Sequence, residues 1–270
     1  MLYQQQSPSA PLDRFVASLW YVRAPSIAFR RERILPTGNI QIILNLARDF
    51  LWDCTEDRAA SALPPSLIVG ARSVYEIVDT SDMADLIGIV FKPGGFPAFA
   101  GDGADRFSNL SIGLADIWGA AEASLRDRLR AIPLPADKLA TLGSFLAERL
   151  ADRRQPHRAV DYALDRFSQA AGIASVAEVA DEIGWSMRRF SQIFREQVGL
   201  SPKVWCRLRR FQTALRQLHA GSEMRWAELA IDCGYYDQSH FCNEFKAFSG
   251  IDITTYQARR SQWINHIAAD

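Results

Sequence analysis

The fold of this chain is decided by two similar stretches, SVAEVADEIGWSMRRFSQIFREQVGL at residues 175–200 and RWAELAIDCGYYDQSHFCNEFKAFSGI at residues 225–251. Matching positions lie fifty residues apart up to the aromatic residue that follows the glycine, and fifty-one apart beyond it. The second copy therefore carries one extra residue in its turn. A pattern that occurs twice indicates a structural unit that is built twice.

Each copy predicts a short helix, a tight turn that begins at a glycine, and a longer helix, which together form a helix-turn-helix. Ser175 and Glu178 have the spacing of a capping box, which supplies partners for amides at a helix start. Gly184 can adopt the left-handed conformation that ends this helix. Ser186 and Asp237 are the expected N-caps of the two longer helices. Apolar residues recur at helical spacing, and those expected to be buried are Val176, Val179, Ala180, Ile183, Phe190, Ile193, Phe194, Val198, Phe241, Phe245 and Phe248.

A long helix is predicted between the two copies, from Ser201 and Pro202 to Gly221. Its expected core face is formed by Trp205, Leu208, Phe211, Leu215 and Leu218. At about 1.5 Å per residue this helix is about 27 Å long. It can hold two recognition helices about one turn of DNA apart, roughly 34 Å. The spacing predicts binding to two adjacent major grooves of double-stranded DNA.

The outward side chains of the two longer helices are hydrogen-bonding groups of the kind that read base edges. The predicted base-reading residues are Arg188, Ser191, Gln192, Gln238, Ser239, Cys242 and Asn243. The predicted phosphate partners, which set register and affinity, are Arg189, Arg195, Lys203, Arg207 and Lys246. Residues 186–216 carry eight Lys or Arg against one Glu, a local charge of +7 in a chain of net charge zero. This stripe is typical of phosphate binding, and a solvated helix face is the alternative.

The second copy resembles the signature of AraC/XylS-type transcription regulators through Gly234-Tyr235, Asp237-Gln238-Ser239-His240-Phe241, Phe245-Lys246, Gly250 and Tyr256. The first copy agrees through Ala180, Gly184, Ser186, Phe190, Phe194, Gly199, Ser201-Pro202, Arg210 and Ala214. Asn243 stands where the family usually has arginine, and Ile253 where it usually has proline. The resemblance covers about the last hundred residues. It implies an all-α DNA-binding domain of two helix-turn-helix motifs joined by a long helix, which regulates transcription.

The first 130 or so residues have a different pattern. Short segments rich in β-branched residues are separated by Pro, Gly and Asp, as in a strand meander or small barrel; they are 40–46, 66–69, 75–78 and 86–91. Helices are expected at about 113–130 and 136–152. With 270 residues, 48% of them hydrophobic, the chain is long enough for two domains with their own cores.

The predicted fold class is therefore α+β, with a β-rich N-terminal domain and an all-α C-terminal domain. The first is expected at 1–155, with its β core at about 12–100 and helices at about 113–152. The polar run 152–156 ends in proline and is the predicted linker. The DNA-binding domain is expected at 156–265, with the two helix-turn-helix motifs at about 175–199 and 226–250.

The N-terminal part is similar to a poorly characterised sensor-like domain often joined to this DNA-binding module. The resemblance rests on Leu35-Pro36-Thr37-Gly38, Gly70, Phe91-Lys92-Pro93-Gly94-Gly95 and Trp118-Gly119, and it implies a cupin-like β core. Thr37 and Asn39 replace an Asp and a Cys at the turn. They shape either a ligand site or only the turn.

A cupin-like core raises the question of an enzyme, because such barrels often hold a metal on two histidines and a carboxylate. The chain has no histidine before His157, so this site cannot be built in the N-terminal domain. No GxSxG, Gly-rich phosphate loop or Walker pattern occurs. We therefore expect no enzymatic activity, metal or cofactor. An enzyme with a carboxylate site around Glu32 or Glu76 is an alternative that no spacing supports.

A pocket for a small-molecule effector is the preferred role for the N-terminal domain. The side chains considered for it are Trp20, Tyr21, Trp52 and Phe91, with Arg33 or Arg72 to hold an anion. Each of them also fits plain core packing or a surface position, so the ligand-binding residues stay unassigned. The function expected is a sequence-specific DNA-binding transcription regulator controlled by a small molecule. The alternative is a small-molecule-binding protein whose DNA-binding half has lost promoter specificity.

The sequence leaves further partners open. A stripe of Leu139, Leu142, Leu146 and Leu150 fits either a homodimer seam or packing on the chain's own barrel. RNA polymerase is a partner if the protein is an activator. No run of eighteen apolar residues and no secretory leader is visible, so no membrane association is expected. The four cysteines form no CxxC pair and are expected as reduced thiols in a cytoplasmic protein.

Overall fold

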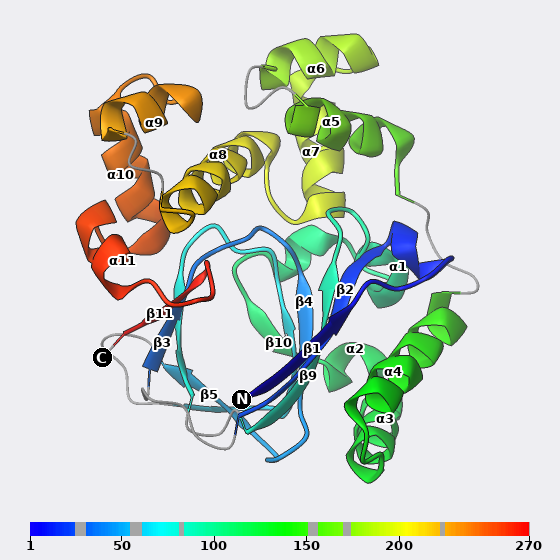
Figure 1. The fold of residues 1–270 in the computed structure, drawn as a ribbon. Coiled ribbons are helices and arrows are strands. Elements are labelled where there is room, and N and C mark those ends of the chain that lie inside the picture. The colour runs from blue at the N-terminus through cyan, green and yellow to red at the C-terminus, as the bar shows by residue number, and fades with distance from the viewer. Residues whose placement is uncertain are drawn as a thin grey trace.

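The N-terminal half of the chain, here residues 1–150, is built on two antiparallel sheets (Figure 1). The computed structural model describes residues 1–24, 31–54, 61–80, 84–150, 156–169, 174–221 and 225–269. The first sheet has the strand order β1 (Leu2–Gln6), β2 (Val16–Arg23), β9 (Asp85–Phe91), β4 (Gln41–Asn45), β7 (Ser66–Val69) and β10 (Ser111–Gly113). The second has the order β11 (His266–Ala268), β3 (Arg31–Ile34), β8 (Glu76–Asp79), β5 (Leu51–Cys54) and β6 (Ser61–Leu63). The predicted strands at 40–46, 66–69, 75–78 and 86–91 are confirmed as β4, β7, β8 and β9.

Successive side chains of a strand point to opposite faces of the sheet, so the first sheet contributes apolar residues to two layers, one on each face. On one face, residues such as Ile42, Leu44 and Ile87 are buried in the main core. The other face belongs to a second apolar cluster that also takes Leu51 and Leu63 from the second sheet. The buried members of this inner cluster are Leu51, Leu67, Val69 and Leu86, and its half-buried members are Trp20, Val22, Ile43 and Leu63. The inner cluster therefore lies between the two sheets.

Helices cover the outer face of the first sheet (Figure 1). They are the short η1 (Leu12–Arg14), α1 (Pro97–Ala100), η2 (Ala104–Phe107) and α2 (Ala115–Trp118), followed by α3 (Ala120–Ala131) and α4 (Pro135–Leu150). The single helix predicted at 113–130 is wrong, because Gly119 takes φ 57° and ψ −140° and separates α2 from α3. The leucine stripe of α4 packs within the chain, since Leu139, Leu142 and Leu146 are buried in the main core.

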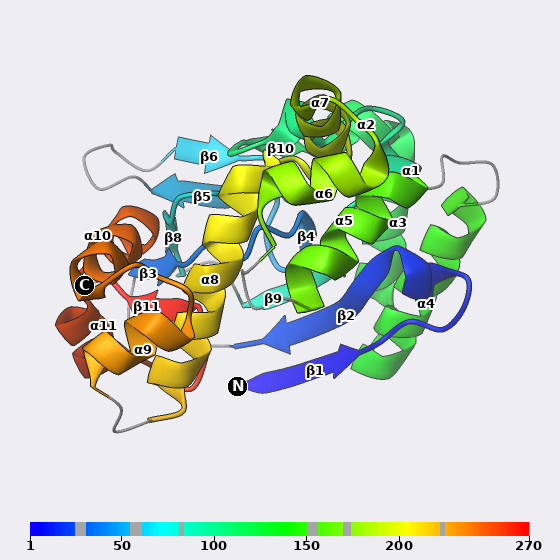
Figure 2. The same ribbon diagram turned by 90° about the horizontal axis from the view of Figure 1, so that it is seen from above.

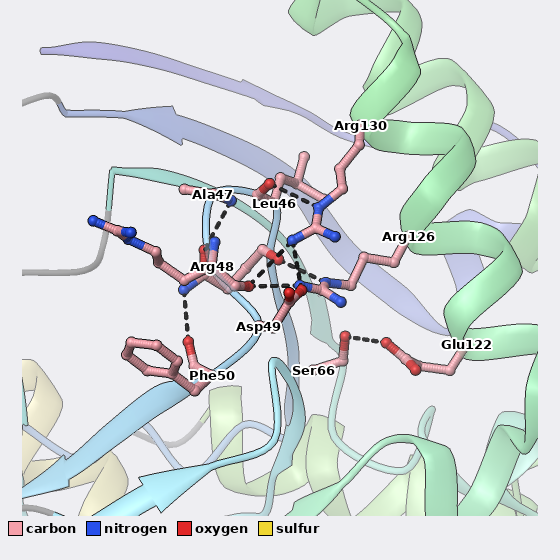
Figure 3. Close-up of polar contacts among 10 residues, drawn as sticks. Leu46, Ala47, Arg48, Asp49, Phe50, Ser66, Glu122, Arg126 and Arg130 are labelled. Atoms are coloured by element: carbon pink, nitrogen blue, oxygen red, sulfur yellow. Dashed lines mark hydrogen bonds and ion pairs between the residues drawn. The ribbon is translucent and has the colours of Figure 1, made fainter.

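A polar face of α3 holds the turn after β4 in place (Figure 3). Arg126, itself buried, donates from Nε to the carbonyl of Asn45 at 2.8 Å and from Nη2 to the Arg48 carbonyl and the Asp49 carboxylate. One helical turn later, Arg130 donates to the Leu46 carbonyl at 2.9 Å and to Asp49 Oδ1 at 2.9 Å. These groups satisfy one another, so we interpret the cluster as a structural clamp.

The C-terminal half, here residues 156–269, is helical apart from its last strand and lies over one end of the two sheets (Figures 1 and 2). Its helices are α5 (Arg158–Gln169), α6 (Val176–Ile183), α7 (Met187–Val198), α8 (Pro202–His219), α9 (Trp226–Asp232), α10 (Gln238–Ser249) and α11 (Ile253–Arg259). The α+β fold class is thus confirmed. Residues 151–155, most of the predicted linker, lie outside the described residues. No helix in the described ranges is long and apolar enough to cross a membrane.

The predicted helix between the two copies is confirmed as α8, and the expected core face of that helix is buried. The chain then ends with β11, which the sequence did not predict. This strand leaves the helical half and pairs antiparallel with β3 of the N-terminal half, with Ile267 opposite Arg33. The last residues therefore tie the two halves together.

Candidate nucleic-acid interface

The first helix-turn-helix is formed by α6 and α7, and its predicted caps are confirmed. Ser175 Oγ accepts from the Glu178 amide at 3.1 Å, and the Glu178 carboxylate accepts from the Ser175 amide at 2.9 Å. Gly184 ends α6 in the left-handed region with φ 74°. Ser186 then caps α7, accepting from the Arg189 amide at 3.4 Å. Phe190, Phe194 and Val198 are buried as expected, which leaves the opposite face of α7 outward.

The second helix-turn-helix is formed by α9 and α10. Gly234 again has a positive φ, 77°, and Asp237 caps α10 by accepting from the His240 amide at 2.7 Å. Phe241, Phe245 and Phe248 form the predicted buried stripe. The two units thus share a positive-φ glycine, a side-chain cap on the longer helix and a buried apolar face, and the second turn is one residue longer.

The predicted base-reading residues occupy corresponding places on the two longer helices. Arg188, Ser191 and Gln192 are the second, fifth and sixth residues of α7, and Ser239, Cys242 and Asn243 are the same positions of α10. Gln238 begins α10. All of them are exposed except Ser191 and Cys242, which are half-buried. Gln192 Nε2 donates to Glu196 Oε1 at 2.9 Å within α7, so this amide is already oriented in the free protein.

The predicted phosphate partners have more varied surroundings. Lys203 on α8 and Lys246 on α10 are exposed. Arg189 is also exposed, and its guanidinium lies over the Trp185 ring at 4.6 Å. Two of the predicted partners pair with acids of the chain: Arg195 lies 3.9 Å from Asp105 in η2, and Arg207 forms an ion pair with Glu244. A phosphate would compete with a carboxylate for these two arginines.

Glu244 is the centre of a polar cluster that fixes α10 on α8. Its carboxylate is largely buried and pairs with Arg207 Nε. Arg210 Nη2 lies 3.8 Å from the other carboxylate oxygen, and His240 Nε2 lies 3.6 Å from the first. The Arg210 guanidinium also faces the ring of Tyr235, at 5.5 Å. A buried carboxylate with two arginine partners holds the second recognition helix to the connecting helix.

Tyr236 is an exposed residue beside the predicted base-reading set, which omits it. It lies in the turn before α10, and 86% of its surface is exposed. It supplies the additional residue of the second turn, between Tyr235 and the cap Asp237. The change of offset from fifty to fifty-one was the signal for it in the sequence. A phenol at the start of a recognition helix can donate a hydrogen bond to a phosphate.

The cysteines of this half are protonated thiols. Burial raises the pKa of Cys206 and of Cys233 to about 11, and it also raises the pKa of Cys242. Cys242 is therefore a small, weakly polar group at its half-buried position on α10. The side chain of Cys54 lies outside the described ones.

The side chains considered for an effector pocket separate into four groups. Tyr21 and Phe91 are fully buried in the main core. Trp20 and Trp52 are half-buried; Trp20 lies over Gly88, where a Cβ would come within 2.4 Å of its ring. Arg72 Nε pairs with Glu76 at 2.8 Å.

Arg33 forms the fourth group, because it serves the contact between the two halves. It is buried and donates from Nη1 to the Ser249 carbonyl of α10 at 3.1 Å. The acids considered for a carboxylate site are paired as well, Glu76 with Arg72 and Glu32 with His266 at 3.0 Å.

Comparison with known families gives two matches. Residues 179–259 match the family described as "Helix-turn-helix domain". Residues 4–113 match the family described as "Domain of unknown function (DUF6597)".

Two curated relatives match the chain in part. The HTH-type transcriptional regulator ExsA of Pseudomonas aeruginosa is 27% identical over 114 residues, which are 42% of this chain and 36% of the relative. The arabinose operon regulatory protein of Escherichia coli is 29% identical over 93 residues, 34% of this chain and 32% of the relative. The chain thus spans about a third of the length of the curated relatives it matches.

Among solved structures, ToxT from Vibrio cholerae is similar over 96% of this chain and 98% of its own, with 10% identity and a TM-score of 0.49. The C-terminal domain of AraT, a response regulator from Geobacillus stearothermophilus, covers 41% of this chain and 93% of its own, with 21% identity and a TM-score of 0.37. The match at residues 179–259 identifies this part of the chain as a helix-turn-helix domain, in agreement with the two units of the structure, and the domain resembles those of the AraC-type regulators.

Proposed function

We propose that this protein is a sequence-specific transcription regulator that binds double-stranded DNA in two adjacent major grooves. The observation that carries the proposal is the matched presentation of α7 and α10, which expose corresponding positions of their first two turns. In helix-turn-helix proteins the N-terminal residues of the second helix contact base edges. Two such helices on one connecting helix suit two successive grooves.

The side chains suggest what each helix reads. Arg188 suits the O6 and N7 acceptors of guanine, and Gln192 and Asn243 suit adenine. Ser191, Gln238 and Ser239 can donate to or accept from several bases, and the thiol of Cys242 suits contact with a thymine methyl group. The phosphate partners are Arg189, Lys203 and Lys246, together with Arg195 and Arg207 if DNA displaces their acidic partners.

Control by a small molecule is the second part of the proposal, and the inner cluster between the sheets supports it. Trp20, Val22, Ile43 and Leu63 are apolar yet only half-buried there. Half-buried apolar side chains gain burial when a ligand covers them. A ligand that raises the Tm of the full chain, and fails to do so after Trp20→Ala, would identify this region as the effector site.

A regulator of this kind acts in the cytoplasm. An activator would contact RNA polymerase, and a homodimer would double the DNA site.

The experiment that tests DNA recognition is selection of bound duplexes from a random library at several salt concentrations. Two enriched blocks about one helical turn apart would support binding through both units. A single block would mean that one unit grips only the backbone. No enrichment, with affinity that only falls as salt rises, would favour a small-molecule-binding protein that has lost promoter specificity.

Arg188→Ala provides the residue-level prediction for this experiment. Loss of a bidentate contact to one base should cost about 1–3 kcal/mol at that position and relax its specificity. Arg128→Ala, which removes an exposed arginine of α3 in the N-terminal half, is the matched control. An equal loss on all sequences would reassign Arg188 to a phosphate.

A further inference from the structure

The N-terminal half contacts both recognition helices at the ends that point away from the proposed DNA. At the end of α7, the cap Gly199 takes φ 91° and lies against the N-terminal half. A Cβ there would come within 3.0 Å of Ala71 Cβ and 3.2 Å of the Ala104 carbonyl, so the backbones are in close contact. Asp105 of η2 adds the ion pair with Arg195. The C-terminal turn of α7 is thus seated on η2.

The connecting helix α8 is seated on the turn before β4. A Cβ on Gly38 would come within 2.8 Å of Leu208 Cδ2 and 2.9 Å of Trp205 Cζ3, so only a glycine lets the turn approach this closely. Gln212 Nε2 donates to the Pro36 carbonyl at 2.7 Å. Thr37 Oγ1 accepts from the Asn39 amide within the same turn. The turn at 35–39 is therefore a docking surface for α8.

Arg33 holds the far end of α10. Its donation to the Ser249 carbonyl satisfies one of the free carbonyls at the helix C-terminus, where a positive charge also interacts favourably with the helix dipole. The guanidinium lies over the Tyr75 ring at 4.1 Å. Gly250, which follows Ser249 in the chain, has φ 73°, and a Cβ on it would come within 2.2 Å of the Tyr75 ring. Strand β3 thus fixes the C-terminal end of α10.

We propose that the β-rich N-terminal half is a platform that fixes the distance and angle between α7 and α10, with Arg33 as the positioning residue for α10. The inference rests on the proposed function. Without the platform, the two helix-turn-helix units are joined through α8, to which the Glu244 cluster fixes α10, and the distance and angle between α7 and α10 can change. Three separate contacts with the N-terminal half, at η2, at the 35–39 turn and at β3, prevent this relative movement. Figure 1 shows α7, α8 and α10 side by side above the sheets of the N-terminal half.

A fixed pair of recognition helices reads the spacing between two DNA blocks as well as their sequence. One inserted base pair moves the second block by about 3.4 Å and turns it by about 34–36° around the DNA axis. A rigid pair cannot follow this movement, whereas a pivoting pair follows part of it. Tolerance to spacing therefore reports the rigidity of the platform.

The test measures affinity of the full chain for duplexes in which the two selected blocks are moved apart or together by one base pair. We expect the wild type to lose about tenfold or more at either changed spacing, because one block is then missed. Arg33→Met keeps an unbranched apolar stem but removes the guanidinium with its donors and its charge, and the loss of affinity of this variant at a changed spacing should fall to about threefold or less. Base preferences within each block should stay the same. Arg23→Met is the matched control, because it removes an exposed arginine of β2 that pairs with Asp85. It should keep the wild-type profile.

If folded Arg33→Met has the spacing profile of the wild type, the proposal is overturned, and α8 alone sets the preferred spacing between the two DNA blocks. Asp105→Lys tests the other seat, because it repels Arg195 from a partly exposed position that tolerates substitution. It should broaden the profile if Arg33→Met does not fold, and an unchanged profile would again overturn the proposal. If the wild type enriches no blocks, the proposed function itself fails, which is a different result from two blocks with an unaltered spacing profile.

Discussion

Single side chains of the proposed interface separate into exposed ones, which we propose to face DNA, and buried ones that hold the helices in place. Arg188 and Asn243 extend from exposed positions of α7 and α10. Glu244, on the same helix as Asn243, is largely buried and receives Arg207 and Arg210 from α8. The same helix thus has one exposed face, which carries Asn243, and one buried face, which ion pairs hold on α8. The arginines clustered in this region therefore have a structural role in addition to the phosphate binding that we propose.

Replacing Glu244 should show how much the ion pairs stabilise α10. Glu244→Ala removes the carboxylate from two arginines that are themselves only partly exposed. Hydrogen bonds to charged groups contribute about 1.5–3 kcal/mol, and solvent screening of Arg207 lowers this, so we expect a loss of about 2 kcal/mol in the free energy of unfolding. Urea denaturation measures it, with Glu228→Ala on the exposed face of α9 as control. A loss no larger than that of the control would mean that the cluster adds no stability.

Between elements, α5 and α6 are joined by a carboxylate with two partners. Glu182 of α6 accepts from Arg166 at 2.9 and 2.7 Å and from the Tyr162 hydroxyl at 2.8 Å. The hydrogen bonds from Arg166 and then Tyr162 lower the pKa of Glu182 from 4.5 to about 2. The folded state therefore favours the ionised carboxylate more than the unfolded state does.

This pKa shift predicts a stability that depends on pH. Because the folded pKa is depressed, the contribution of Glu182 is fully present above about pH 4.5 and is lost as the pH falls towards 2. The difference in unfolding free energy between the wild type and Glu182→Gln should shrink across this window. Denaturant titrations of both proteins from pH 6 to pH 2 measure it, at pH values set by that window. A constant difference would show that the bonds to Arg166 and Tyr162 do not depend on the charge.

Local signals predicted the elements of the interface well, because caps and turns act over a few residues. Ser175, Gly184 and Ser186 fixed the bounds of α6 and α7 from sequence alone. Gly119 was a comparable signal that the predicted helix at 113–130 overlooked. The edge strand β1, LYQQQ, has no apolar alternation to reveal it, since all of its residues are exposed.

Contacts between the halves could not be predicted, because they join residues far apart in the chain. Arg33 and Ser249 are 216 residues apart, and no sequence feature near either residue indicates that the two are in contact. The turn at 35–39 could be recognised as a turn, but its role in docking α8 depends on Gln212 and Trp205. The strand His266–Ala268 is only three residues long and is stabilised by pairing with β3. Contacts of this kind between the two halves can be identified only in the folded structure.

At the scale of the whole molecule, one buried apolar cluster runs from the first sheet through α8 and α10 to Ile267 in the last strand. Secondary structure that shares a core and hydrogen bonds unfolds together. We therefore expect the two halves to unfold in a single transition, although the sequence divides into two regions. Hydrogen exchange of peptides from β9 and from α8 should give the same free energy of opening in the wild type.

Ile267→Ala should uncouple the halves in this measurement. Ile267 is 1% exposed, and truncating a buried isoleucine to alanine costs about 2–5 kcal/mol. Because β11 belongs in sequence to the helical half but pairs with β3, the loss falls on the contact between the halves. Peptides from α8 should then exchange at a lower free energy than those from β9, whereas a substitution confined to one half, such as Leu129→Ala in α3, should leave α8 at the global value or lower both together. If α8 already opens well below β9 in the wild type, the halves are independent units and a platform that fixes both recognition helices is ruled out.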